Sequence, residues 1–160
     1  TLQEQSGFTV ELPQVYTRRQ EGENGWLFFN DQEAGTPLVR SFFVTWRPLG
    51  EAEPTAGSAL EWRNEIADSV YDWPQQAHEE PLQSRVLREP GAGGVEIRGN
   101  WSGVDRSFPQ AGPFIARVIR CPDQDREYLL DAWLYAPAAD KYQYMIQLET
   151  LLASFRCGQA

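Results

Sequence analysis

A single histidine, His78, limits the chemistry that this sequence can support. A Ser-His-Asp or Cys-His system would have to use it, and no serine or cysteine near it has a recognisable nucleophile context. The stretch GNWSG (99–103) is close to a nucleophile elbow, but Asn100 stands where that motif has glycine. A loop histidine followed by two glutamates is typical of a solvated side chain. The sequence therefore favours a protein that is not an enzyme.

Metal and nucleotide sites are not predicted either. One histidine and two cysteines cannot complete the usual zinc site without carboxylates. Asp123, Asp125 and Glu127 are spaced as in a calcium loop, but the run lacks the glycine and distal glutamate of an EF-hand, which favours a polar hairpin turn. GAGG (91–94) lies between two predicted strands and opens no helix, so it does not cradle phosphate. We expect no metal and no cofactor.

The stretch RGNWSGVDRSFPQAGPF (98–114) is the candidate binding loop. It connects two predicted strands with eleven intervening residues, more than a tight hairpin needs. Its glycines and prolines are turn residues, whereas Asp105 and Arg106 have no evident structural role. Trp and Arg are enriched among interface hot spots. We therefore predict a binding surface of Trp101, Asp105 and Arg106, provided that Trp101 and Arg106 face solvent together.

The charge of the chain narrows the classes of partner. The net charge is −9, and the basic residues are thirteen arginines and one lysine, Lys141. An acidic surface repels phosphate backbones and anionic lipids, so neither nucleic acid nor an anionic membrane surface is expected as a partner. No apolar run approaches the length of a membrane helix. The classes of partner that remain are a protein and a small ligand.

The order of predicted elements indicates an α+β fold. A capping box at Ser58 and Glu61 begins a helix that Pro74 ends, with an apolar stripe from Ala59 to Trp73. Asp140 caps a second helix that Gly158 ends. Short turns join successive strands, which predicts an antiparallel sheet of about six to seven strands in the order βββαββββα, within one domain of residues 1–160. The predicted strands are 7–13, 26–29, 38–49, 82–89, 95–101, 113–121 and 127–137.

The two cysteines, Cys121 and Cys157, are predicted to meet. The strand that ends at Cys121 turns back through PDQD, and the next strand runs to the opposite end of the sheet. The final helix must return antiparallel to that strand, which delivers Cys157 to the same end as Cys121. A disulfide is favoured over two separate buried thiols, and it indicates a location outside the cytoplasm.

The C-terminal half resembles the domain-of-unknown-function family numbered 4837, a group of bacterial cell-envelope lipoproteins. The matching features are Gly99 with Trp101, the strand start Gly112 to Phe114, the strand end Tyr135 to Pro137, and the closing helix YMIQLETLL. The resemblance is strongest over residues 95–156. It implies secretion, a lipid anchor upstream of Thr1 and, because family members are longer, a chain that forms half of a longer lipoprotein. The element order is similar to that of the PsbP/Mog1 sandwiches.

Three functions follow from these observations. The first is a non-catalytic, extracytoplasmic binding or assembly module of the cell envelope, with an unidentified protein or small ligand as partner. The second is a carbohydrate-binding or glycan-hydrolysing protein that uses exposed Trp and a carboxylate pair; the 23 acidic residues offer many pairs and single out none. This alternative fails if at least five of the six Trp are buried. The third is a structural or lipid-handling protein, which needs a dry apolar cavity.

Overall fold

The computed structural model describes residues 2–31, 38–89, 92–105, 107, 109–137 and 140–158. The helices are α1 (Leu2–Ser6), α2 (Ala56–Ser69), α3 (Tyr142–Ala153) and the short 3-10 helix η1 (Pro122–Gln124). The strands are β1 (Phe8–Thr9), β2 (Thr17–Gln20), β3 (Gly25–Asn30), β4 (Val39–Pro48), β5 (Gln75–Ala77), β6 (Gln83–Glu89), β7 (Ala92–Gly103), β8 (Ala111–Cys121), β9 (Arg126–Tyr135) and β10 (Arg156–Cys157).

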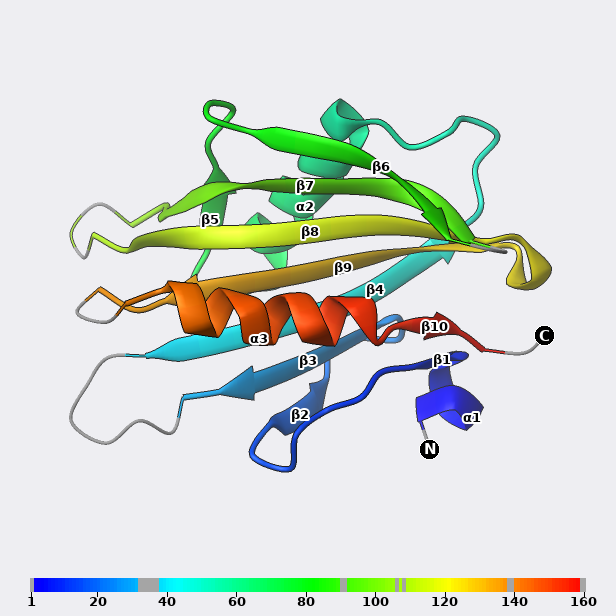
Figure 1. Ribbon diagram of the computed structural model, residues 1–160, viewed down its shortest axis with the longest axis horizontal. Coiled ribbons are helices and arrows are strands. Elements are labelled where there is room, and N and C mark those ends of the chain that lie inside the picture. The colour runs from blue at the N-terminus through cyan, green and yellow to red at the C-terminus, as the bar shows by residue number, and fades with distance from the viewer. Residues whose placement is uncertain are drawn as a thin grey trace.

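Eight strands form one antiparallel sheet in the order β2-β3-β4-β9-β8-β7-β5, and β6 pairs with β7 beside β5. Helices α2 and α3 lie on opposite faces of this sheet (Figure 1). The expected α+β class and antiparallel pairing are confirmed. The sheet has eight strands instead of six or seven. Strands β2 and β5 were not predicted, whereas the predicted first strand, 7–13, is reduced to β1, which pairs with β10 in a separate two-stranded sheet.

The central strands bury side chains on both faces of the sheet, because successive residues of a strand point in opposite directions. In β4, Phe42 and Val44 belong to the core under α3, whereas Phe43 belongs to the core under α2. In β9, Leu130 belongs to the core under α3 and Trp133 to the core under α2. The result is two apolar layers that share one sheet.

Helix α2 begins three residues earlier than the sequence predicts. Thr55 is the N-cap: its side chain accepts a hydrogen bond from the Ser58 amide, and the Ser58 hydroxyl accepts one from the Thr55 amide. The capping box therefore pairs Thr55 with Ser58 instead of Ser58 with Glu61. The helix also ends at Ser69, before the predicted stop at Pro74, so Trp73 lies beyond it.

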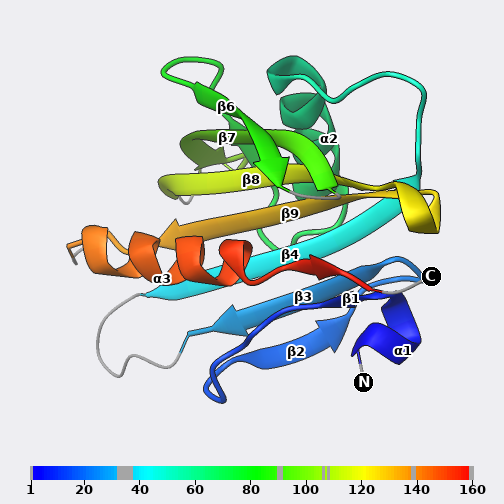
Figure 2. The same ribbon diagram turned by 45° about the vertical axis from the view of Figure 1, so that its right-hand side comes forward.

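The two ends of the described chain lie side by side (Figure 2). Strand β1 pairs with β10, and a disulfide joins Cys121 to Cys157 with a Cα–Cα distance of 5.9 Å. The Gly7 carbonyl accepts hydrogen bonds from the Gly158 amide (2.8 Å) and the Gln124 side chain (2.6 Å). The sequence-based prediction of the disulfide is thus confirmed, since α3 returns antiparallel to β9 as expected.

Helix α2 covers only part of its face of the sheet. It packs on β5, β7, β8 and β9, whereas β2 and β3 lie at the opposite edge of the sheet (Figure 1). Among the described residues, no helix therefore covers the α2 side of β3 and of part of β4. This uncovered sheet face carries the candidate site.

Candidate functional site

The predicted binding loop does not present its tryptophan to solvent. Trp101 is fully buried, and its indole N–H donates a hydrogen bond to the Leu134 carbonyl at 3.3 Å. Asp105 is exposed, but its carboxylate accepts hydrogen bonds from the Ser107 amide (2.9 Å) and hydroxyl (2.6 Å), which closes a local turn. Arg106 lies outside the described residues. The prediction that Trp101 forms part of an exposed surface is wrong, because its ring completes the core beneath α2.

His78 has a serine neighbour that the sequence did not reveal. Its Nε2 lies 2.5 Å from the Ser102 hydroxyl, because β5 pairs with β7 and brings together residues 24 apart in the chain. Among the residues that the structure describes, no carboxylate forms a hydrogen bond with the other ring nitrogen. The pair therefore lacks the third group that would orient a catalytic histidine.

Five of the six tryptophans are buried, and Trp73 is the exception at 38% exposure. The buried rings are those of Trp26, Trp46, Trp62, Trp101 and Trp133. A sugar-binding surface that stacks on several tryptophans would need more than one of them exposed. The carbohydrate alternative is therefore wrong in the form predicted, since a single exposed indole cannot supply its platforms.

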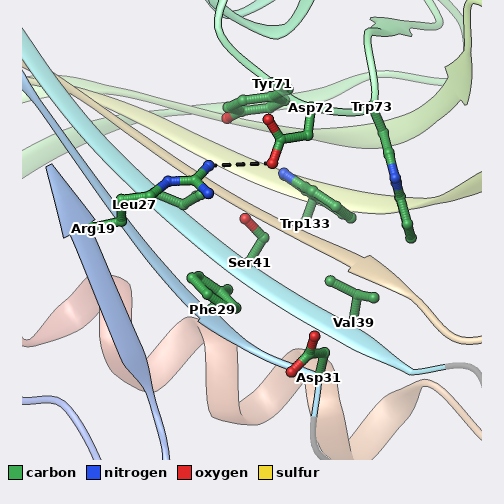
Figure 3. Close-up of a pocket in the computed structure, with 10 residues that line it drawn as sticks. All are labelled: Arg19, Leu27, Phe29, Asp31, Val39, Ser41, Tyr71, Asp72, Trp73 and Trp133. Atoms are coloured by element: carbon green, nitrogen blue, oxygen red, sulfur yellow. Dashed lines mark hydrogen bonds and ion pairs between the residues drawn. The ribbon is translucent and has the colours of Figure 1, made fainter. Parts of the chain in front are cut away.

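The exposed tryptophan lines a groove of about 230 Å³, which we call the aromatic groove (Figure 3). It lies on the sheet face that α2 leaves uncovered. Strands and the segment that follows α2 both contribute to its walls. Its lining residues are Arg19, Leu27, Phe29, Asp31, Val39, Ser41, Tyr71, Asp72, Trp73 and Trp133.

The alternation of β3 explains why apolar side chains reach the groove. Trp26 and Phe28 point toward α3 and belong to that core, so Leu27 and Phe29 must point to the opposite face. Because no helix covers that face here, Leu27 and Phe29 are only half-buried. The floor of the groove is thus a sheet surface that a more extended α2 would have covered.

Trp73 is supported from behind by other aromatic rings. Its ring centroid lies 6.2 Å from that of Trp133 and 5.7 Å from that of Tyr135, the latter in an edge-to-face arrangement. Trp133 in turn packs edge-to-face on the buried Trp101 at 5.2 Å. These contacts restrict the Trp73 side chain, so the groove has a rigid aromatic wall.

A buried polar network fixes the segment that carries Tyr71, Asp72 and Trp73. The Tyr71 hydroxyl donates a short hydrogen bond to the Asp131 carboxylate, which also accepts one from Arg63 Nε at 3.1 Å. Arg63 and Asp131 are both fully buried. Burial, reinforced by the Asp131 charge, raises the pKa of Tyr71 well above its ordinary value of 10.0, so the hydroxyl stays protonated and remains a donor.

The charged residues of the groove lie around its rim. Arg19 Nη2 contacts the Asp72 carboxylate at 3.2 Å, and Arg19 Nε contacts Glu21 at 2.5 Å. Asp31 is exposed, and Figure 3 shows it at the end of the groove opposite Asp72. The groove therefore combines an apolar floor with a predominantly acidic rim.

Sequence reasoning missed this groove because it placed Trp73 on the buried stripe of a longer helix. One available observation argued against that placement: a residue before proline, as Trp73 is before Pro74, is biased away from helical geometry. Arg19 and Phe29 carried no comparable indication. Their importance depends on which part of the sheet α2 leaves open.

The described part of the chain contains neither a metal-binding cluster nor a membrane-spanning helix. No group of three or more His, Cys, Asp or Glu side chains is arranged there to hold a metal ion. None of the described helices is both long and apolar enough to cross a membrane.

The same fold occurs in solved structures at low sequence identity. The Ran-binding protein Mog1p of Saccharomyces cerevisiae is 12% identical, with a TM-score of 0.57 over 96% of this chain and 91% of that one. A Mog1 variant matches equally well, over 92% of its length. Cyanobacterial PsbP of Synechocystis sp. PCC 6803 is 13% identical, with a TM-score of 0.57 over 94% of this chain and 86% of that one. The PsbP/Mog1-like architecture is confirmed.

The sequence itself matches one family. No curated protein is detectably similar in sequence. A family model described as a domain of unknown function, DUF4837, matches residues 1–154, from the N-terminus to the end of α3. This range is wider than residues 95–156, on which the resemblance was strongest. The chain therefore belongs to the DUF4837 family.

Proposed function

We propose that the protein is a non-catalytic binding module and that a protein partner docks in the aromatic groove. The observation that carries this proposal is the position of Trp73. It is the one tryptophan that is not buried, and it lines a groove with the half-buried Leu27 and Phe29 on a sheet face without a covering helix. Aromatic residues that line a pocket are typical anchors of protein interfaces.

The preformed shape of the groove supports binding without large rearrangement. Trp133 and Tyr135 hold Trp73, and the Asp131 carboxylate holds Tyr71. Rigid side chains lose little conformational entropy when a partner docks, which favours affinity. The fold is also compatible with this role, because the similarly folded yeast Mog1p is a Ran-binding protein.

The proposed location is outside the cytoplasm. It rests on the disulfide between Cys121 and Cys157, since such bonds persist in oxidising compartments. A lipid anchor upstream of Thr1 and a longer envelope lipoprotein remain predictions from the family resemblance. That residues 1–160 form one domain also remains a prediction, made from the length of the chain.

The test selects ligands for the purified protein from a library of random peptides displayed on phage. Selected peptides are then measured against Trp73→Ala, Phe29→Ser and the control Tyr142→Ala, which removes an aromatic ring that is 74% exposed on α3. We expect Trp73→Ala and Phe29→Ser to weaken binding about tenfold or more, and Tyr142→Ala to leave it unchanged.

Thermal unfolding of each variant establishes that it is folded before binding is measured. Peptides that bind Trp73→Ala and Phe29→Ser as tightly as the unmodified protein would contradict docking in the groove. Equal losses in all three variants would also contradict it, because Tyr142 lies on the helix that covers the opposite face.

A further inference from the structure

The walls of the aromatic groove are suited to a positive charge. Phe29, Tyr71, Trp73 and Trp133 provide aromatic rings, and Asp31 and Asp72 provide carboxylates. Figure 3 shows Asp72 at one end of the groove and Asp31 at the other. The faces of aromatic rings carry negative electrostatic potential and attract cations within about 6 Å of the ring centroid.

The charges that line and flank the groove do not cancel. Arg19 is the one positive group among the lining residues, and it already contacts two carboxylates, those of Glu21 and Asp72. Asp31 forms no ion pair with any residue that the structure describes. The carboxylates of Glu21, Asp31 and Asp72 outnumber the single guanidinium of Arg19. The groove therefore carries an excess of negative charge, which an incoming cation would neutralise.

Elsewhere in the same molecule, an arginine occupies a comparable site. The Arg47 guanidinium lies 3.8 Å from the centroid of the Trp62 ring, and its Nε donates a hydrogen bond to Glu127 at 2.6 Å. A tryptophan face and a carboxylate thus hold one guanidinium between them. Asp72 precedes Trp73 in the chain and lines the same groove, and no guanidinium of the described residues lies over the Trp73 ring.

Ser41 adds a polar group to the floor of the groove. The residue is 2% exposed, and its hydroxyl has no hydrogen-bond partner among the residues that the structure describes. Figure 3 shows this hydroxyl directed into the groove, between Trp133 and Phe29. A buried hydroxyl without a partner is costly, so Ser41 is a polar group that the described chain leaves unsatisfied beside the groove.

We propose that the aromatic groove binds the side chain of an arginine or lysine presented by a basic segment of the protein partner. This inference rests on the proposed function and names the chemistry that the groove recognises. The cation lies against Trp73, with the Asp72 and Asp31 carboxylates at the two ends of the groove. The net charge of −9 accelerates the approach of a basic segment, and this effect weakens as salt is added.

The test uses two small probes, N-acetylarginine amide and the uncharged N-acetylcitrulline amide, which differ in charge but hardly in shape. Each is titrated into the ¹⁵N-labelled protein while the indole N–H resonances are observed by NMR. The Trp73 resonance is identified by its loss in Trp73→Phe. The Trp101 resonance serves as the internal control, because that indole is buried and hydrogen-bonded to Leu134.

We expect the arginine probe to shift the Trp73 resonance saturably and the citrulline probe to bind at least about tenfold more weakly. Asp31→Asn should weaken the arginine probe severalfold. The control Asp123→Asn, which removes the same charge from the exposed η1 turn, should leave its affinity unchanged.

Two results would overturn the inference. If both probes shift the Trp73 resonance with equal affinity, the groove does not distinguish charged from uncharged ligands. That result contradicts the inference but leaves the proposed function intact. If neither probe shifts Trp73, the groove holds no arginine side chain. The peptide selection with Trp73→Ala then decides the proposed function independently of this outcome.

Discussion

Trp101 and its neighbours show what the family motif residues do. Trp101 pairs across β7 and β8 with Gly112, and Gly99 pairs with Phe114 in the same register. A Cβ atom at Gly99 would lie 3.2 Å from Phe114 Cε1, and one at Gly112 would lie 3.1 Å from Trp101 Nε1, so each glycine leaves room for the ring opposite. These four of the residues that carry the resemblance to DUF4837 are therefore packing residues.

Gly112 is a position where this packing makes a sharp prediction. A Cβ atom there would overlap the Leu134 carbonyl oxygen and lie 3.1 Å from Trp101 Nε1. We expect Gly112→Ala to lower the free energy of unfolding by about 2 kcal/mol or more, because backbone atoms cannot move aside as a side chain can. Urea denaturation followed by tryptophan fluorescence measures the loss.

Gly93→Ala is the matched control for Gly112→Ala. Gly93 lies on β7, and a Cβ atom there would meet nothing within 4 Å. Its replacement should change the free energy of unfolding by about 0.5 kcal/mol at most. Equal stabilities of the two variants would refute the packing account of the motif.

At the scale of elements, Glu96 connects three strands and a helix. It faces Arg85 on β6 and Arg117 on β8 in the register of the sheet, and their Nε atoms donate to its carboxylate at 2.8 and 2.9 Å. Arg98 of β7 donates to it as well and also contacts Glu149 of α3. The carboxylate thus holds the β6 edge of the sheet to its centre.

This arrangement predicts a dependence of stability on pH. Burial alone would raise the pKa of Glu96, but hydrogen bonds from the three arginines outweigh it and lower that pKa from 4.5 to about 2. A carboxyl group whose pKa is lower in the folded state stabilises that state fully at pH values above the pKa it has in the unfolded chain. This stabilisation is lost as the pH falls toward the pKa of the folded state. The free energy of unfolding should therefore fall by on the order of 2–3 kcal/mol from pH 5 to pH 2.

Glu96→Gln tests whether Glu96 is the source of this dependence. Urea denaturation at a series of pH values should show a flatter profile for Glu96→Gln than for the unmodified protein. Glu61→Gln, which changes an exposed glutamate of α2, should keep the original slope. If Glu96→Gln retains the full dependence, other carboxyl groups cause it.

The elements differ in how much of them the sequence specifies. Long apolar or alternating strands such as β4, β8 and β9 were predicted within a few residues, because their buried faces require the pattern. The short strands β2 and β5 were missed: β2 is exposed throughout, and the pairing that creates it is a tertiary effect. The aromatic groove was missed for the same reason, since it exists only where α2 stops.

At the scale of the whole molecule, three interactions tie the chain ends to the turn between β8 and β9. The disulfide joins Cys157 to the end of β8, Gln124 of η1 donates to the carbonyls of Gly7 and Gly158, and Arg126 donates to the Ser6 carbonyl at 3.0 Å. Strands β1 and β10 contain two residues each, too few to stay paired without such support.

The disulfide should therefore make a large contribution to stability. Its cysteines are 36 residues apart, and closing a loop of that length stabilises by about 3–4 kcal/mol when loop closure restricts the unfolded chain. We expect Cys121→Ser with Cys157→Ser to lower the urea midpoint correspondingly. Dithiothreitol should lower the midpoint of the unmodified protein to a similar value and leave the double variant unchanged; an unaltered midpoint in both would contradict this role.

The pairing of β1 with β10 has a consequence for recognising distant relatives. Because the two ends of the described chain meet, a short linker could join them and the chain could be opened at another surface turn. Such a circular permutant would keep every strand neighbour and both core layers while changing the order of the elements along the sequence. Proteins related in this way would match the fold in space but score poorly in any comparison that reads residues from first to last.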